Sequence, residues 1–323
     1  MVGTGRIIIP LWQDTLDNYL LHSEEDVCMK AETVLQQGKE NMKHLTLYKF
    51  NTYLKRTLIY LFLLAFAMMF LLPFFFLFTG SFKTTSELFA VPFHWLPKQW
   101  TLDNYKEVFT KIPFFRYLGN TLIVVVFNIL GALVSNSVIS YGFSRLRWPG
   151  RDKVFMVVVA TMILPYQVTL IPIYLLFSKI GWIGTFLPLI VPGFFGNAFY
   201  IFLLRQFLIS IPKEITESAK IDGAKEFTIF FRLMMPISKP VLATVAIMAF
   251  MRAWNDFLGP LVFLASDRLY TLSLAASMLR SNLNPNWELL LALGVVMVTP
   301  VLVLFFLLQR YFIQGITMGA VKG

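Results

Sequence analysis

The sequence contains little that could support thiol or metal chemistry. Its single cysteine, Cys28, excludes an internal disulfide and any cysteine-based metal site. The three histidines, His22, His44 and His94, are scattered along the chain, so a histidine metal cluster is not expected. The apolar segments also carry no Ser/His, paired-Asp or metal-ligand set. We therefore predict no metal site, no catalytic residues and no enzymatic activity for this chain.

Charge is also scarce. Only 14% of the 323 residues are charged, whereas 57% are hydrophobic and 33 are phenylalanine. The mean hydropathy is +0.67. A soluble domain of this length carries more charge, so most of the chain is predicted to lie in lipid. The net charge of +10 then indicates basic loops on the cytoplasmic side of a membrane rather than a nucleic-acid surface.

Six apolar stretches are long enough to cross a bilayer, which needs about 20 apolar residues per helix. They lie at about 57–79, 117–140, 153–176, 183–209, 238–265 and 289–310. Some contain proline, such as Pro73 and Pro165, which buried spanning helices tolerate. The sequence thus predicts an all-α membrane protein with six transmembrane helices.

The loops orient these spans. The loop after the second span, "SRLRWPGRDK", holds four basic residues, Arg145, Arg147, Arg151 and Lys153. The loop after the third span holds only Lys179. Because cytoplasmic loops carry the excess of basic residues, the former faces the cytoplasm. Alternation then predicts an N-in/C-in topology, with residues 80–116 outside and the loop between spans four and five inside.

The first 56 residues are predicted to form a cytoplasmic N-terminal segment, ahead of a six-span domain over 57–323. Residues 1–41 are polar and are neither a signal peptide nor a span. They could form an amphipathic helix that docks on a partner, or translation could start at Met42. We favour the second interpretation, because a polar segment with few large apolar residues has little means of ordering itself.

A compact block of small and charged residues, "ESAKIDGAKEFTIFFRLMMP" (217–236), separates spans four and five. Residues 213–221 predict a short amphipathic helix along the membrane surface, and Gly223 permits a sharp bend before a helix over 224–234. Ala219 and Gly223 are four residues apart and would form a small face that a partner can approach closely.

The same block carries carboxylates and prolines. Glu217 and Asp222 offer carboxylates to a basic partner, and Pro236 and Pro240 mark the return of the chain to the membrane. The alternative is an ordinary polar loop whose surface ion pairs contribute little. Spacing and location favour a docking element.

The spacing of this block is similar to a known signature. The cytoplasmic motif E-A-A, three residues, G, nine residues, I-x-L-P is matched by Glu217, Ser218, Ala219, Gly223, Leu233, Met235 and Pro236, with Ser218, Leu233 and Met235 as conservative departures. "PFHWLPKQWTLDNYKEVF", "YGFSRLRWPGR", "AWNDFLGPLVF" and "QGITMGAVKG" agree. From about residue 57 to its end, the chain resembles membrane permeases of binding-protein-dependent ABC importers of the carbohydrate-uptake type, especially the shorter permease of maltose importers.

The resemblance implies a type I ABC importer permease fold and a multi-pass location in the bacterial cytoplasmic (inner) membrane. It implies a coupling helix at about 213–228 that docks on an ATPase subunit through Glu217, Ser218, Ala219, Asp222, Gly223, Ala224 and Pro236. It also implies a tail contact with the ATPase through Gln314, Lys322 and Gly323. For the tail, the alternative is a frayed terminus.

The motor is expected on another chain. A phosphate-binding loop of the G-x-x-x-x-G-K-[ST] type is absent, since "TGSFKTTS" (79–86) does not match the pattern. No cofactor is therefore predicted on this chain, and ATP with Mg is expected on the partner. The resemblance implies a second homologous permease, a dimer of ATPase subunits, an extracytoplasmic solute-binding protein and a sugar as partners.

Polar residues inside spans are costly and indicate a substrate path. Asn120 and Asn128 share roughly one face of span two, with Ser135 further along it. In span five, Arg252 and Asp256 stand four residues apart. The predicted path residues are Asn120, Asn128, Tyr166, Arg252, Trp254, Asn255 and Asp256. The alternative is helix packing, in which amides bridge neighbouring spans and Arg252 neutralises Asp256.

Two function classes follow. The first is the permease subunit of an ATP-driven carbohydrate importer, for which the resemblance implies an oligosaccharide or similar polyhydroxyl solute. Because Arg252 is a cation, an acidic sugar also remains compatible with the sequence as the substrate. The rival is an ion- or proton-coupled secondary transporter, which usually carries titratable residues near the membrane midplane. Beyond Arg252, Asp256 and Glu288 the spans offer almost none, so the first class is favoured.

Overall fold

The computed structural model describes residues 52–280 and 286–320, with side chains up to Gln309. The chain forms two compact units, residues 1–73 and 74–323. In the first unit, the described residues belong to the helix Thr52–Gly80, which continues into the second. Its side chains are almost all exposed and apolar, and the Phe62 and Phe66 rings lie 4.6 Å apart. The predictions for residues 1–41 lie outside the described residues.

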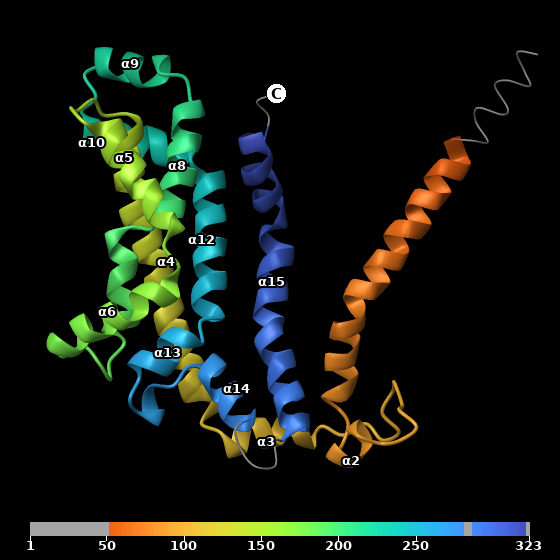
Figure 1. Ribbon diagram of the computed structural model, residues 1–323. Helices are drawn as coiled ribbons and strands as arrows, with labels where there is room; N and C mark the ends of the chain where they lie inside the picture. The colour runs from red at the N-terminus through yellow and green to blue at the C-terminus, as the bar shows by residue number, and fades with distance from the viewer. Residues whose placement is uncertain (1–51, 281–285, 321–323) are drawn as a thin grey trace, which may run out of the picture. The chain divides into compact units, whose positions relative to one another are not determined.

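The second unit is built from helices (Figure 1). Its longer helices are α4 (Phe114–Ser144), α5 (Arg151–Ala160), α6 (Tyr166–Lys179), α8 (Ala198–Ser210), α12 (Lys239–Trp254) and α15 (Trp287–Ala320). Shorter helices connect them: α2 (Thr85–Leu88), α3 (Asp103–Lys111), η1 (Thr161–Ile163), α7 (Leu187–Ile190), η2 (Val191–Phe195), α9 (Glu214–Ile221), α10 (Glu226–Thr228), η3 (Ile229–Met234), α11 (Met235–Ile237), α13 (Leu258–Phe263), η4 (Asp267–Leu269) and α14 (Leu272–Arg280).

Four helical segments are long and apolar enough to cross a membrane without a break: Thr52–Gly80, Phe114–Ser144, Leu187–Ser210 and Trp287–Gln309. Two further segments are pairs of helices, bent by 100° between Ile163 and Tyr166 and by 77° between Ile237 and Lys239. The apolar run predicted at about 153–176 is therefore two helices, whereas the second bend lies at the start of the run predicted at about 238–265 and leaves α12 unbroken from Lys239 to Trp254. Pro165 explains the first break, because it has no N–H to donate and Leu164 before it is extended (ψ 115°).

Helix α4 is the centre of the second unit. It packs against α8 and α12 through a cluster of small and branched side chains, among them Ala132, Leu204 and Val245. It also approaches η2 very closely: a Cβ on Gly131 would lie 2.9 Å from the carbonyl carbon of Gly193. Glycine at position 131 thus lets the two backbones touch.

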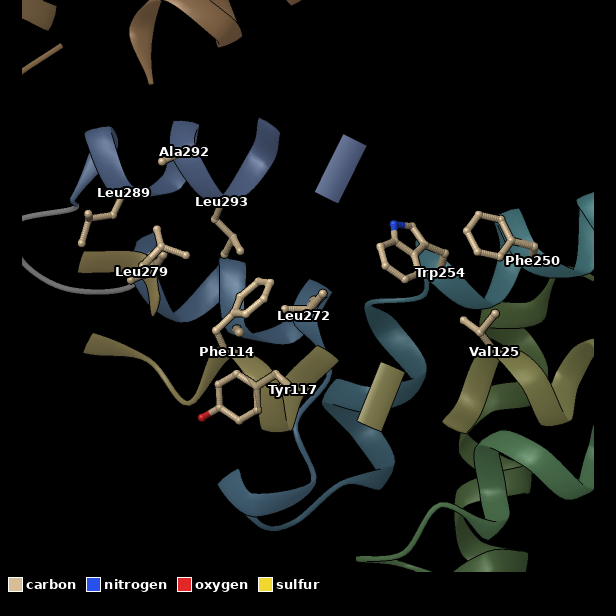
Figure 2. Close-up of a cluster of buried hydrophobic side chains, with 12 residues drawn as sticks. Phe114, Tyr117, Val125, Phe250, Trp254, Leu272, Leu279, Leu289, Ala292 and Leu293 are labelled. Atoms are coloured by element: carbon tan, nitrogen blue, oxygen red, sulfur yellow. The ribbon is translucent and has the colours of Figure 1, made fainter. Parts of the chain in front are cut away.

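A larger hydrophobic cluster joins α4 and α12 to α14 and α15 (Figure 2). It contains Phe114, Tyr117 and Val125 of α4, Phe250 and Trp254 of α12, Leu272 and Leu279 of α14, and Leu289, Ala292 and Leu293 of α15. This cluster therefore holds the C-terminal end of α12 and the N-terminal end of α15 against α4.

A third cluster lies where α4 and α8 end. Tyr141 of α4, Leu208 of α8 and Ile229, Phe230 and Met234 of η3 are all buried there. Helix α9 lies across this end, far from α3 and α14 (Figure 1). The cluster thus forms the platform on which the 213–237 block rests.

Candidate functional site

The block between spans four and five folds as a short surface helix followed by a tight bend. Helix α9 (Glu214–Ile221) agrees with the predicted helix over 213–221. Gly223 adopts φ +82°, a left-handed conformation that favours glycine. The N–H of Ala224 donates to Ala219 O at 2.9 Å, and the N–H of Gly223 donates to Lys220 O at 3.0 Å. This pair of hydrogen bonds is the Schellman motif, which satisfies the last carbonyls of α9 and reverses the chain.

The two alanines of the block, Ala219 and Ala224, face their own protein. Ala219 and Ala224 are half-buried and pack on the cluster around Tyr141 and Phe230. Their size lets α9 lie close to its platform, a role that the sequence did not indicate. Asp222 and Gly223 are exposed, and a Cβ on Gly223 would meet no atom within 4 Å.

The outer face of the block combines charge with exposed apolar side chains. Glu217 and Ser218 are exposed on α9. Ile221 and Phe227 are 87% and 75% exposed, beside the half-exposed Phe231. Large apolar side chains in such positions are typical of surfaces that a partner covers. Sequence reasoning missed these three residues, although Ile221, an apolar side chain at the end of the polar helix α9, could have been identified by its position.

Glu226 connects the block to α4. Its Oε2 accepts a hydrogen bond from the Tyr141 hydroxyl at 2.6 Å, and its Oε1 pairs with Lys220 Nζ of α9 at 2.5 Å. Pro236 lies in α11, before the 77° bend at the buried Ser238. The carboxylate therefore ties the surface helix to a spanning helix, a connection that involves residues 85 positions apart.

Arg145 fixes the other side of the platform. It follows the last residue of α4, and its Nη2 donates to Leu208 O at 2.5 Å and to Ile211 O at 2.7 Å. These carbonyls end α8 and have no helical donor of their own. Burial lowers the pKa of the Arg145 guanidinium. The basic loop thus holds the end of α8 in addition to carrying charge.

Several predicted path residues surround one cavity of about 490 Å³ in the second unit. Its polar lining includes Asn128, Tyr166, Asn197, Arg252 and Asp256, and its walls include aromatic rings and prolines. Asn128 also donates to Leu189 O at 2.8 Å, which bridges α4 and α7. The structure thus brings together four predicted residues from three separate segments and adds Asn197.

Arg252 and Asp256 do not stand on one helix turn, although they lie four residues apart in the apolar run predicted as span five. Helix α12 ends at Trp254 because the Asn255 amide donates back to Met251 O at 2.8 Å. Asp256 lies beyond it, and its Oδ1 accepts from the N–H of Gly259 at 3.0 Å. This contact caps α13 and directs the chain away from the axis of α12.

The other predicted path residues do not line this cavity. Trp254 is buried in the cluster of Figure 2, and its indole N–H donates to Met297 O at 3.1 Å. Asn120 donates to Arg268 O and Tyr270 O at 2.9 Å, which joins α4 to η4 and the residue after it. For these two residues the geometry agrees with the alternative of helix packing. Asn255 is exposed and bonded to its own helix, so it agrees with neither interpretation.

Comparison with known families decides the class. Residues 128–318, which include the α9 block and the cavity, match the family described as "Binding-protein-dependent transport system inner membrane component". The chain belongs to this family. The surface helix α9 and most residues that line the cavity thus lie within the region that defines the family.

Relatives of this chain include transport permeases that are named after sugars. It is 34% identical to the arabinooligosaccharides transport system permease protein AraQ of Bacillus subtilis (strain 168), over 81% of this chain and 94% of the relative. It is 30% identical to the lactose transport system permease protein LacG of Rhizobium radiobacter, over 77% and 90%. The resemblance to carbohydrate-importer permeases is thereby confirmed.

A solved structure shares the fold. A chain from the crystal structure of a bacterial ABC transporter involved in the import of the acidic polysaccharide alginate superposes with a TM-score of 0.71, at 24% identity, covering 78% of this chain and 94% of that chain. At this identity the match speaks for the fold alone. The mostly helical architecture with four to six spans agrees with the predicted importer permease fold.

The C-terminal prediction is only partly visible. Helix α15 runs to Ala320, so the backbone at Gln314 is helical, and α15 ends on the side of the unit where α9 lies (Figure 1). Lys322 and Gly323 lie outside the described residues.

Proposed function

We propose that this protein is the permease subunit of an ATP-driven importer of oligosaccharides in the bacterial inner membrane. The observation that carries the proposal is the 213–237 block. It is a rigid surface helix with exposed apolar and charged side chains, tied to α4 through Glu226, at the position of the family signature. Such a block can transmit the movement of a partner into the spans.

In this proposal α9 docks on an ATPase subunit, with Glu217, Ser218, Ile221 and Phe227 on the contacting face. Ala219, Gly223 and Ala224 keep the helix on its platform, Asp222 lies at the bend, and Pro236 at the return to the membrane. ATP and Mg bind to the ATPase dimer, and this chain binds neither. Six spans, with each bent pair counted as one, and an N-in/C-in topology place the block in the cytoplasm.

The substrate path is proposed along the cavity. Asn128, Asn197 and Arg252 offer hydrogen-bond donors, Asp256 offers a carboxylate, and Tyr166 offers an aromatic face. This combination suits polyhydroxyl solutes. The sugars after which the relatives are named, arabinooligosaccharides and lactose, support a sugar substrate. A second homologous permease would complete the path, and a solute-binding protein would deliver the sugar.

The deciding experiment is reconstitution of the complete importer in liposomes with Gly223→Asp. ATP hydrolysis and uptake of a labelled arabino-oligosaccharide are measured with and without binding protein. The matched control is Gly181→Asp, because Gly181 also has a positive φ (+71°) and open space around its Cβ. Both variants suffer the same backbone strain, about 1–2 kcal/mol, but only Gly223 lies in the block.

We expect stimulated hydrolysis and uptake to fall at least tenfold in Gly223→Asp and to stay near wild type in Gly181→Asp. Equal activities of the two variants would contradict the coupling role of the block. Uptake that proceeds without ATP and follows a proton gradient would instead identify a secondary transporter.

A further inference from the structure

A second pocket, away from the sugar cavity, is lined mainly by cations. It has a volume of about 460 Å³ and lies between the loop that joins α4 to α5 and the start of α9. Its charged lining consists of Arg147, Arg151, Lys153, Lys213 and Asp152. Four positive groups therefore surround one carboxylate.

The carboxylate is already neutralised. Asp152 Oδ1 pairs with Arg151 Nε at 3.1 Å and with Arg205 Nη2 at 3.2 Å. The side chains of Arg147, Lys153 and Lys213 are exposed and make no hydrogen bond or ion pair within residues 52–280 and 286–309. The pocket consequently carries an uncompensated positive charge that suits an anion.

The pocket also lies at the edge of an apolar surface. Lys153 and Val157 are four residues apart on α5 and thus share a face of the helix. Val154, Met156 and Val157 are 45%, 71% and 66% exposed. Trp148, a residue type enriched at membrane interfaces, also lines the pocket. An anionic head and an apolar tail can thus be accommodated side by side.

We propose that this pocket binds the headgroup of an anionic phospholipid, with the acyl chains along the exposed face of α5. Free phosphate would use the cations but not the apolar face. An acidic protein surface would use the charge but not the membrane depth of Met156 and Val157. The inference goes beyond sugar transport and requires only that α4 and α5 end at the membrane surface.

The test uses the intact complex in detergent and counts bound lipids by native mass spectrometry. Phosphatidylglycerol and phosphatidylcholine with the same acyl chains are added separately. The pocket variant is Arg147→Gln/Lys213→Gln. Its matched control is Arg232→Gln/Lys239→Gln, which removes two exposed cations outside the pocket. Thermal melting of each complex verifies the fold.

Each cation near an anionic headgroup is worth about fivefold in affinity, so the pocket variant should retain phosphatidylglycerol roughly thirtyfold less well. The control variant should retain phosphatidylglycerol as the wild type does. Retention of phosphatidylcholine should stay unchanged in both variants. Lys153→Gln, a single exposed substitution, should lower phosphatidylglycerol retention about fivefold. It replaces the double variant if that variant has a lower melting temperature than the wild type.

Three results would overturn the proposal. Equal phosphatidylglycerol retention by the pocket variant and its control excludes this pocket as the lipid site. Retention of inorganic phosphate that the pocket variant loses, with unchanged lipid binding, identifies a free-phosphate site. Loss of the ATPase subunits from the pocket variant, again with unchanged lipid binding, identifies a protein-docking surface.

Discussion

The hydroxyl of Tyr141 donates a 2.6 Å hydrogen bond to Glu226, the carboxylate that also holds Lys220. Tyr141 is buried at the end of α4, whereas Glu226 follows the bend after α9. A spanning helix and a surface helix are thus joined through one side chain. The two contacts differ in strength, since the ion pair of Glu226 with Lys220 is about half exposed and is worth less than about 1 kcal/mol.

Replacing Tyr141 by Phe removes the bond to α4 and leaves the ring in place. We expect the stability of the complex to fall by about 1 kcal/mol, and the amount of sugar transported per ATP to fall several-fold, because movement of α9 is no longer passed fully to α4. Uptake and hydrolysis are measured on the same vesicles.

The matched control for this change is Tyr105→Phe. Tyr105 shares a 2.7 Å hydrogen bond with Ser81, in the segment after the first predicted span. It should show a similar loss of stability with unchanged transport per ATP. Equal transport ratios for the two variants would show that the Tyr141 bond serves stability alone.

Replacing Arg145 by Gln should destabilise the platform. Two carbonyls at the end of α8 lose a charged donor, which costs about 2–3 kcal/mol in the free energy of unfolding. Thermal melting of the complex measures the effect. Arg145→Lys should recover part of the loss, because an ammonium group can reach one of the two carbonyls but lacks the fork of a guanidinium. A melting temperature of Arg145→Gln equal to wild type would contradict the capping role.

Replacing Arg252 by Gln should impair the cavity without affecting the coupling block. We expect the KM for sugar uptake to rise about tenfold, as for the loss of one charged hydrogen bond, while basal ATP hydrolysis remains unchanged. Arg116→Gln, an exposed arginine near the start of α4, is the control. A change in basal hydrolysis with an unchanged KM would place Arg252 in coupling rather than in the sugar path.

Truncation after Tyr311 tests the tail. The shortened chain lacks Gln314, Lys322 and Gly323, and we expect weaker stimulation of ATP hydrolysis by binding protein, about threefold or more, with normal insertion into the membrane. Truncation after Ala320 removes only the last three residues and separates their contribution. Full stimulation with both truncated chains would leave the tail as a frayed end.

Local features were predictable from the sequence. The bend follows from the glycine at position 223, which adopts a positive φ, and the helix before it from its pattern of small and charged side chains. The apolar runs could also be identified, because the hydropathy of a segment depends only on its own residues and not on the segments that pack against it. The family motif depended on the same short stretch.

Features set by distant partners were not predictable. From the sequence alone, Trp254 was predicted to line the substrate path. In the structure its indole N–H donates to Met297 O, 43 positions away along the chain. In the sequence, Glu226 is indistinguishable from an ordinary surface charge. Its hydrogen bond with Tyr141 is visible only in the structure. The end of α12 at Trp254 depends on the side chains of Asn255 and Asp256, which form hydrogen bonds with backbone groups. Hydropathy shows only one long apolar run there and gives no sign of a helix terminus.

Helix α4 contains 31 residues in one continuous segment, which is roughly 46 Å at about 1.5 Å per residue. One end meets Glu226, Asn128 borders the cavity along the way, and Asn120 holds the loop near the other end. A straight helix of this length amplifies small rotations: a tilt of about 5° at the Glu226 end moves the other end by roughly 4 Å. If α9 docks on an ATPase subunit as we propose, a small rotation there would displace the Asn120 end of α4 by several times as much as the end that the ATPase moves.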